Sequence, residues 1–164
     1  MTYESPLVGY ENAELLPSTI NPDGISLFNP PGPKSASYDE FPKPIDPSNG
    51  FDFHIYYTQG VPSETKYARE LHERVRREFP ELRIHELLDW PVPPHLTTTF
   101  EVNTSNPHQT GALFCWFVVH RGPCSVLIHP HTGNPLRDHT ELATWIGKPW
   151  PVDVDIIKKH SPSD

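Results

Sequence analysis

The sequence is poor in several features that define common protein classes. Among 164 residues there are only two cysteines, too few for a disulfide-stapled chain of this size, so we expect free thiols in a reducing compartment. Lysine and arginine together number 13 against 21 aspartates and glutamates, which gives a formal net charge of -8. This balance argues against nucleic acid as the main partner, because phosphate binding needs a basic surface.

Long apolar segments are also missing. No stretch approaches the roughly 18 apolar residues of a membrane-spanning helix, and the first residues lack the basic and then apolar order of a secretory leader. We therefore expect no membrane association and a cytoplasmic location. The nine glycines are scattered, so there is no phosphate-binding glycine loop, and neither a GxSxG serine motif nor an HExxH zinc motif occurs.

Proline and histidine, in contrast, are abundant, with 21 and 10 residues. Nine of the prolines fall within residues 1–49, where no helical or strand period survives. Apolar residues nevertheless recur along this segment, which weakens the alternative of a disordered tail. We expect residues 1–49 to form a Pro-rich extended arm docked on a domain of residues 50–164.

Apolar periodicity becomes readable from residue 51 onward. Residues 51–57 alternate with period 2, which predicts a strand with Phe53 and Ile55 on its core side. Prolines 62 and 107 predict the starts of two helices. The expected elements are strand 51–57, helix 63–79, strands 82–87 and 97–102, helix 107–119, strand 124–129 and a short helix at 141–146, followed by an extended C-terminal extension. This β-α-β-β-α-β order is the ferredoxin-like α+β pattern, an antiparallel sheet with its helices on one face.

The same alternation gathers polar residues on the open face of the predicted sheet. In this topology the first strand lies between the third and the fourth, with neighbours about 4.8 Å apart. Period 2 then places Asp52 and His54 of the first strand beside Glu101 and His129 of its two neighbours. His95 enters from the proline-rich loop before the third strand.

Two or three histidines beside a carboxylate are the ligand set expected for a non-haem Fe(II) ion with vacant positions. Zinc accepts similar ligands, so the residues alone leave the metal open. His131, in the turn after the fourth strand, could line such a site. The alternative is that these histidines are solvated surface residues and that Glu101 pairs with an arginine.

Five short motifs follow one another from the first strand to the last turn: Phe53-His54-Ile55-Tyr56-Tyr57, Pro91-Val92-Pro93-Pro94-His95, Phe100-Glu101-Val102, Val126–Gly133 and Leu136-Arg137-Asp138-His139-Thr140. Together they resemble the DOPA 4,5-dioxygenase family, small extradiol dioxygenases of fungi and bacteria, over about residues 51–155. The arm, with its Gly9-Tyr10-Glu11-Asn12 run, resembles the longer form found in filamentous fungi.

The resemblance implies a ferredoxin-like fold and extradiol cleavage of a catechol such as L-DOPA with Fe(II) and O₂. By the same resemblance His54, His95 and His129 would bind the metal, although zinc or another divalent ion could occupy the isolated protein. His139 would be the proton-transfer residue. Asp52, the other candidate catalytic residue, stands where many members of the family have a histidine.

Two further residues and several alternatives complete these expectations. Tyr56 or Arg137 could bind an anionic group of the substrate. A non-catalytic ferredoxin-like module that binds a small ligand or a partner chain is one alternative function, and a zinc or iron enzyme for another small cyclic substrate is a second. Exposed sheet edges are compatible with a homodimer.

Overall fold

The computed structural model describes residues 5–160 and divides the chain into two units, residues 1–35 and 36–164. The first unit contains no helix or strand among its described residues, only turns and an isolated antiparallel bridge between Ile20 and Leu27. Asp23 closes that loop by accepting hydrogen bonds from the backbone nitrogens of Ile25 and Ser26 at 2.8 and 2.9 Å. Docking of the arm on the domain remains a prediction.

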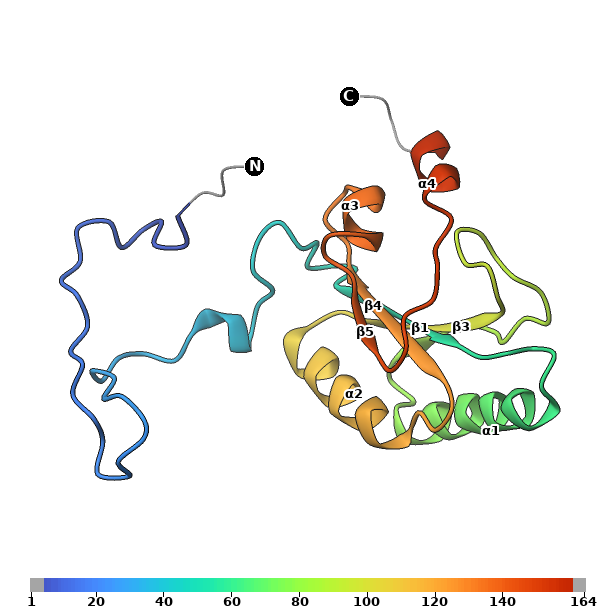
Figure 1. Ribbon diagram of the computed structural model, residues 1–164, viewed down its shortest axis with the longest axis horizontal. Helices are drawn as coiled ribbons and strands as arrows, with labels where there is room; N and C mark the ends of the chain where they lie inside the picture. The colour runs from blue at the N-terminus through green and yellow to red at the C-terminus, as the bar shows by residue number, and fades with distance from the viewer. Residues whose placement is uncertain (1–4, 161–164) are drawn as a thin grey trace. The chain divides into compact units, whose positions relative to one another are not determined.

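A five-stranded antiparallel sheet forms the centre of the second unit (Figure 1). Its strands are β1 (Phe51–Tyr56), β2 (Arg83–Ile84), β3 (Thr99–Thr104), β4 (Ser125–Pro130) and β5 (Thr144–Ile146), in the spatial order β2-β3-β1-β4-β5. The register sets His54 opposite Glu101 on one side and Leu127 on the other. The predicted ferredoxin-like order, with the first strand between the third and fourth, is therefore confirmed.

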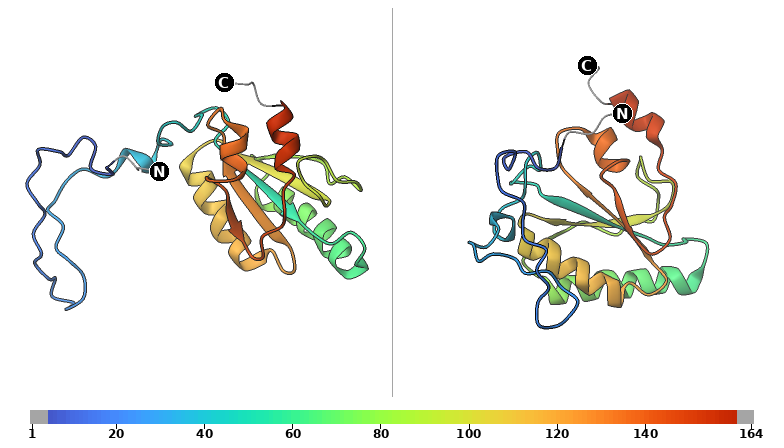
Figure 2. Two further views of the ribbon diagram at one scale, coloured as in Figure 1. Left: turned by 45° about the horizontal axis from the view of Figure 1, so that its top comes forward. Right: turned by 60° about the vertical axis from the view of Figure 1, so that its left-hand side comes forward.

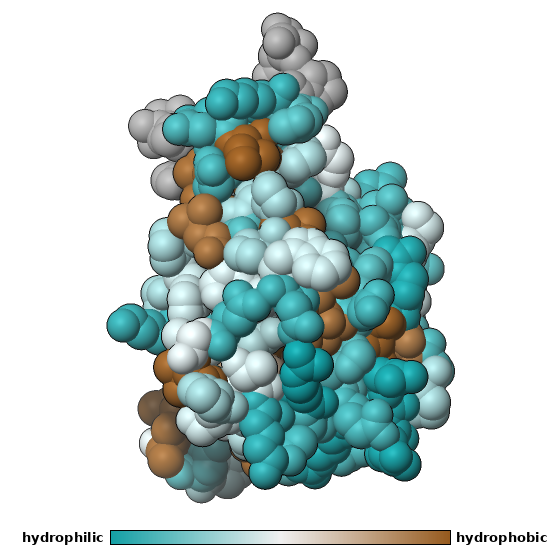
Figure 3. All heavy atoms as spheres, turned by 90° about the vertical axis from the view of Figure 1, so that its right-hand side faces the viewer, coloured by the Kyte–Doolittle hydropathy of each residue, from teal (hydrophilic) through white to brown (hydrophobic). Residues whose placement is uncertain are grey.

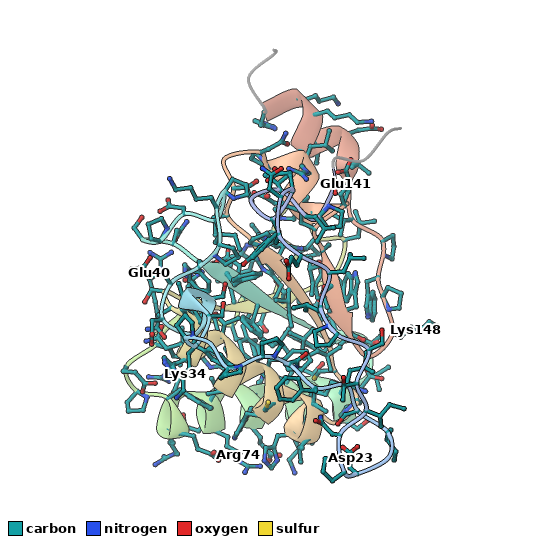
Figure 4. All side chains as sticks on the ribbon, turned by 90° about the vertical axis from the view of Figure 1, so that its left-hand side faces the viewer. Asp23, Lys34, Glu40, Arg74, Glu141 and Lys148 are labelled. Atoms are coloured by element: carbon teal, nitrogen blue, oxygen red, sulfur yellow. The ribbon has the colours of Figure 1, made fainter. Side chains whose placement is uncertain are left out.

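Two long helices, α1 (Pro62–Glu78) and α2 (Pro107–His120), cover one face of this sheet (Figures 1 and 2). On α1 the buried residues Ala68, Leu71 and Val75 follow helical spacing, as the sequence predicts. They pack with the inward side chains of the strands, Phe53 and Ile55 among them, in one hydrophobic core. The opposite side of α1 is solvated, and Arg74 points away from the sheet there (Figure 4), 2.7 Å from Glu78.

The region after β4 differs from the sequence-based expectation. The helix predicted at 141–146 is wrong, because residues 144–146 form the edge strand β5, which pairs with Val126–Ile128. A helix does form earlier, α3 (Pro135–His139), because the Asn134 side chain accepts the Arg137 backbone N–H at 3.0 Å and proline occupies the first turn. A further helix, α4 (Val154–His160), follows the extended segment.

The helices α3 and α4 lie on the other side of the sheet from α1 and α2 (Figure 2). The short segment before β1, which includes the 3₁₀ turn Ala36–Tyr38, belongs to the same unit. Its Asp46 backbone N–H donates to the His131 carbonyl at 2.8 Å, and the Phe41 and Phe51 rings lie 5.5 Å apart. Within residues 5–160, no helix has both the length and the apolar character required to cross a membrane.

A pair of glycine substitutions tests the backbone that leads into β1. Gly50 has a φ of +52°, and an added Cβ would lie 2.1 Å from the Thr104 carbonyl oxygen. Gly50→Ala should therefore lower the free energy of unfolding by about 3 kcal/mol. Gly111→Ala, in the interior of α2 with nothing within 4 Å of the new Cβ, should raise it by up to about 1 kcal/mol. Urea unfolding of both variants measures the contrast, and equal effects would contradict it.

Candidate metal centre

The polar residues of β1 lie on the sheet face opposite the α1 and α2 helices. Because side chains alternate along a strand, Phe53 and Ile55 enter the core while Asp52, His54 and Tyr56 point to the other face. That face was expected to be open, but α3, α4 and the loop between β2 and β3 cover it. His54 is only 5% exposed and His129 only 2%, so these histidines are not solvated surface residues.

Three of the histidines bring ligand nitrogens together. One nitrogen each of His54, His129 and His139 lies within 4.8 Å of the others. β1 carries His54, β4 carries His129, and the last residue of α3 is His139. The group therefore joins two adjacent strands to the short helix that follows β4.

Hydrogen bonds on the outer side of the ring orient two of the three imidazoles, and a carboxylate faces the third. His129 Nδ1 donates to the Pro130 carbonyl at 3.0 Å, and His139 Nδ1 donates to the Pro135 carbonyl at 2.8 Å. His54 Nδ1 faces the Glu101 carboxylate at 3.8 Å. His129 and His139 are thus left with Nε2 as the accepting nitrogen, which is how metal-binding histidines are usually held, and His54 turns its own Nε2 toward that of His129.

The distances and protonation states fit a metal ion. The Nε2 atoms of His54 and His129 are 3.1 Å apart. Two nitrogen ligands that each lie about 2.1 Å from one ion are roughly 3.0 Å apart when they subtend a right angle at the ion, and roughly 3.4 Å apart in a tetrahedral site. Burial, with the nearby His95 and His129, holds the pKa of His54 well below its usual value. Burial and His139 lower the pKa of His129 to about 4, so both rings are neutral at pH 7 and able to bind a cation.

His95 lies beside this group but is not part of it. Its ring centre is 4.2 Å from that of His54, yet its Nδ1 is hydrogen-bonded to the hydroxyl of Tyr56. Burial raises the pKa of Tyr56, so the phenol stays protonated. Because burial also lowers the pKa of His95 to about 3, the ring is neutral and carries one proton, on Nδ1 or on Nε2, and the Tyr56 hydroxyl is able to pair with either tautomer.

A second polar group surrounds Asp52. His131 Nε2 donates to Asp52 Oδ2 at 2.7 Å, and the Asn103 amide donates to the other carboxylate oxygen. Burial opposes ionisation of Asp52, but the hydrogen bond and charge of His131 outweigh it and lower the pKa of the carboxyl group. The same hydrogen bond raises the pKa of His131. Asp52 and His131 therefore each stabilise the charged form of the other, and Asp52 Oδ2 lies 4.0 Å from His129 Nε2.

Two of the predicted site residues have other partners than expected. Glu101 accepts a hydrogen bond from Asn103 at 2.6 Å and lies 3.4 Å from His85 Nε2, so it pairs with an amide and a histidine where the alternative expected an arginine. Together with Asp52 and His54 it forms another group of potential metal ligands. Arg137 is directed away from the histidines and pairs at 3.2 Å with Glu141, which lies at the surface beyond α3 (Figure 4).

A cavity of about 320 Å³ opens onto the histidines. It is lined by side chains from β1, β3, β4, α3 and the loop before β3, with Leu88, Val92 and Pro93 supplying an apolar wall. The volume suits a single aromatic ring with a short substituent. The cavity, the neutral rings of His54 and His129 and the adjacent Asp52–His131 pair form an arrangement that could hold a metal ion and a small ligand.

The sequence analysis missed three residues that shape this site. Asn103 bridges Asp52 and Glu101, and its position two residues after Glu101 on β3 was the available signal, because same-parity residues share a face. The Trp145 and Trp150 rings lie 5.0 and 6.1 Å from Tyr56. No local pattern marks them, since they reach Tyr56 only through the path of the C-terminal segment.

The neutral histidines predict a pH-dependent stability for the protein freed of divalent metal. The lowered pKa values of His95 and His129 favour the folded state above pH 6.5, and this contribution is lost as the pH falls toward about 4, because the unfolded chain takes up protons first. We expect a loss of about 2 kcal/mol per histidine at pH 5, offset in part by His131, which titrates in the opposite sense. Urea unfolding in EDTA at pH 7.5 and pH 5 measures it.

The variant His129→Gln supplies the comparison, since it removes one of the buried titrating groups. Its stability should depend less steeply on pH than that of the parent chain. Equal stability of the parent chain at the two pH values would contradict the assignment of neutral buried histidines.

The fold and the site define a class: a ferredoxin-like α+β protein with a histidine-rich cluster that could hold a metal ion beneath a small cavity. A profile of the Dopa 4,5-dioxygenase family matches residues 51–156, which include the five strands and every site residue described above. The chain belongs to this family.

Individual relatives agree with the family match. The chain is 48% identical over 168 residues to an uncharacterized 21.2 kDa protein of Botryotinia fuckeliana, covering 96% of this chain and 92% of the relative. It is 32% identical over 108 residues to the DOPA 4,5-dioxygenase of Amanita muscaria, covering 62% of this chain and 46% of that enzyme. Family and relative thus point to an enzyme of the DOPA dioxygenase type.

A solved structure supports the fold. The crystal structure of a Nostoc punctiforme protein described as a "putative dioxygenase" superposes with a TM-score of 0.62 at 23% identity, over 69% of this chain and 94% of that one. At this identity the likeness shows the ferredoxin-like fold alone.

Proposed function

We propose that the protein is an extradiol ring-cleaving dioxygenase that acts on a catechol such as L-DOPA with Fe(II) and O₂. The observation that carries the proposal is the convergence of His54, His129 and His139 beneath a cavity of about 320 Å³. The family membership supplies the reaction class, and a set of three imidazoles leaves positions on an ion vacant for substrate and oxygen.

In this proposal His54, His129 and His139 hold the iron, and His95 lies beside it without binding it. His95 and His139 thereby exchange the roles that the sequence resemblance implies. Iron, when bound, would acidify the catechol hydroxyls and bring catechol and O₂ together. Burial keeps His54 and His129 neutral, and Pro130, Pro135 and Glu101 face the outer nitrogens of the three rings.

The remaining residues of the cavity act on the substrate. We assign the proton of His95 to Nε2, with the Tyr56 hydroxyl donating to Nδ1, so that the ring presents a hydrogen-bond donor to an oxygen of the bound catechol or of O₂. Asp52, the hydrogen-bond partner of His131, lies next to the ligand set and provides a carboxylate that can accept a hydrogen bond from a catechol hydroxyl. The apolar wall of Leu88, Val92 and Pro93 excludes water from the ring.

Oxygen uptake tests the proposal directly. Protein loaded anaerobically with Fe(II) should consume one O₂ for each catechol when L-DOPA or 4-methylcatechol is added, with a new yellow ring-cleavage product in the visible spectrum. Zinc-loaded protein is the control and should bind catechol without consuming oxygen. Iron bound without any catechol-dependent uptake would reject the dioxygenase, and failure to bind a metal at all would favour a small-ligand-binding module.

A further inference from the structure

The charged side chains that line the cavity bear on which substituents a bound catechol can carry. The cavity lining contains three carboxylates, Asp52, Glu86 and Glu101, and six histidines, but no lysine or arginine. Asp52 is paired with His131 at 2.7 Å. The negative charges left over are those of Glu101 and Glu86.

These two carboxylates are differently placed. Glu101 is 26% exposed and is held by the Asn103 amide and by the nearby rings of His85 and His54. Glu86, on the loop after β2, is exposed, and its carboxylate has neither a hydrogen bond nor an ion pair with any residue in the described range 5–160. A charged substituent that leaves the cavity on this side therefore meets uncompensated negative charge.

No permanent cation offsets that charge on the cavity side. Arg83 is nearby, but its Nε donates to Asn103 Oδ1 at 2.7 Å and its side chain lines a different hollow. Arg137 is paired with Glu141 on the outer side of α3. The surface on the side that carries the 85–98 loop and α4 is mostly hydrophilic, with small hydrophobic patches (Figure 3).

The other direction open to a substituent is apolar. A second cavity of about 490 Å³ shares Pro93, Pro94 and His139 with the first and continues toward α4. Its remaining lining consists of Pro135, Ile156, Ile157 and His160. In neither direction does a substrate carboxylate meet the arginine or lysine that usually binds such a group.

We propose that the site selects catechols whose side chain is positively charged or neutral and discriminates against those whose side chain carries only a carboxylate. The inference rests on the proposed function, since it concerns the ligand of the same cavity. A carboxylate near Glu86 and Glu101 suffers like-charge repulsion in a partly desolvated site, whereas an ammonium group is attracted. Glu86 is the specificity-determining residue for this difference, because it is the unpaired carboxylate at the mouth.

Three catechols that differ in side-chain charge provide the test: dopamine, 4-methylcatechol and 3-(3,4-dihydroxyphenyl)propionate. Their Kd values are measured by anaerobic calorimetry on zinc-loaded protein, so that the readout does not depend on turnover. We expect dopamine to bind at least tenfold more tightly than the propionate, and the ratio to shrink as salt is raised from 0.02 to 0.5 M. The same order is expected in kcat/KM with the iron-loaded protein.

Two substitutions test whether Glu86 causes the difference in Kd between dopamine and the propionate. Glu86→Gln should narrow the ratio of the two Kd values about threefold, while Glu81→Gln, a change of an exposed carboxylate that lines a different hollow, should leave it unchanged. A propionate that binds as tightly as dopamine, while 4-methylcatechol still binds and is cleaved, would overturn this inference and leave the proposed function standing. A protein that binds and cleaves none of the three would instead reject the proposed function. A ratio unaffected by Glu86→Gln would overturn the role of that residue.

Discussion

Replacing His139 by alanine should abolish iron binding and catechol-dependent oxygen uptake. Its imidazole is one of three that converge within 4.8 Å, and loss of a ligand from a three-histidine set should weaken metal affinity at least 100-fold. His139 is only half-buried at the end of a five-residue helix, so the variant should fold normally. Metal content after dialysis and oxygen consumption measure the two losses.

Two companion variants sharpen this result. His108→Ala removes an exposed histidine at the start of α2 that faces Asp39 and is not one of the three proposed ligands. This variant should keep full metal content. His95→Ala should also retain iron. If His95→Ala loses the metal while His139→Ala keeps it, the ligand set is His54, His95 and His129, as the sequence resemblance implies.

The second large effect concerns His95 as a residue that acts on the substrate. His95→Ala should reduce kcat by about 10²- to 10³-fold, because it removes a fixed hydrogen-bond donor from the reacting oxygens. Tyr56→Phe should have a smaller effect of about tenfold, since it frees His95 to adopt the other tautomer while leaving the ring in place. Steady-state oxygen uptake over a range of pH separates the two variants.

Tyr57→Phe provides the matched control for Tyr56→Phe. Tyr57 is 1% exposed and its hydroxyl has no hydrogen-bond partner among the described residues. Its removal should leave kcat and the pH profile unchanged and should not lower stability. Equal losses in the two phenylalanine variants would show that Tyr56 acts through packing and not through its hydrogen bond to His95.

Much of the fold follows from local sequence patterns. The alternation of residues 51–57 predicted correctly that Phe53 and Ile55 enter the core and that Asp52 and His54 face the other side, because side-chain direction in a strand depends only on parity. Asn106 and Pro107 predicted the start of α2 for a similarly local reason: the amide caps the helix at 2.9 Å and proline needs no N–H partner there.

The region after β4 could not be predicted in the same way. Residues 141–146 were expected to be helical, yet Thr144–Ile146 gains backbone hydrogen bonds by pairing with β4. That gain depends on an unpaired edge of β4 being within reach, which is a property of the sheet and not of the segment. The covering of the histidine face by α3 and α4 follows from the same chain path.

The sequence by itself therefore determined the family, the ferredoxin-like order and the face on which His54, Glu101 and His129 lie, because motif order and period-2 alternation are local properties. Only the tertiary structure brought His139 to His54 and His129, placed the Tyr56 hydroxyl against Nδ1 of His95, and paired Asp52 with His131. Each of these contacts joins segments that no sequence period relates, so their geometry depends on how the loops and the added helices fold back over the sheet.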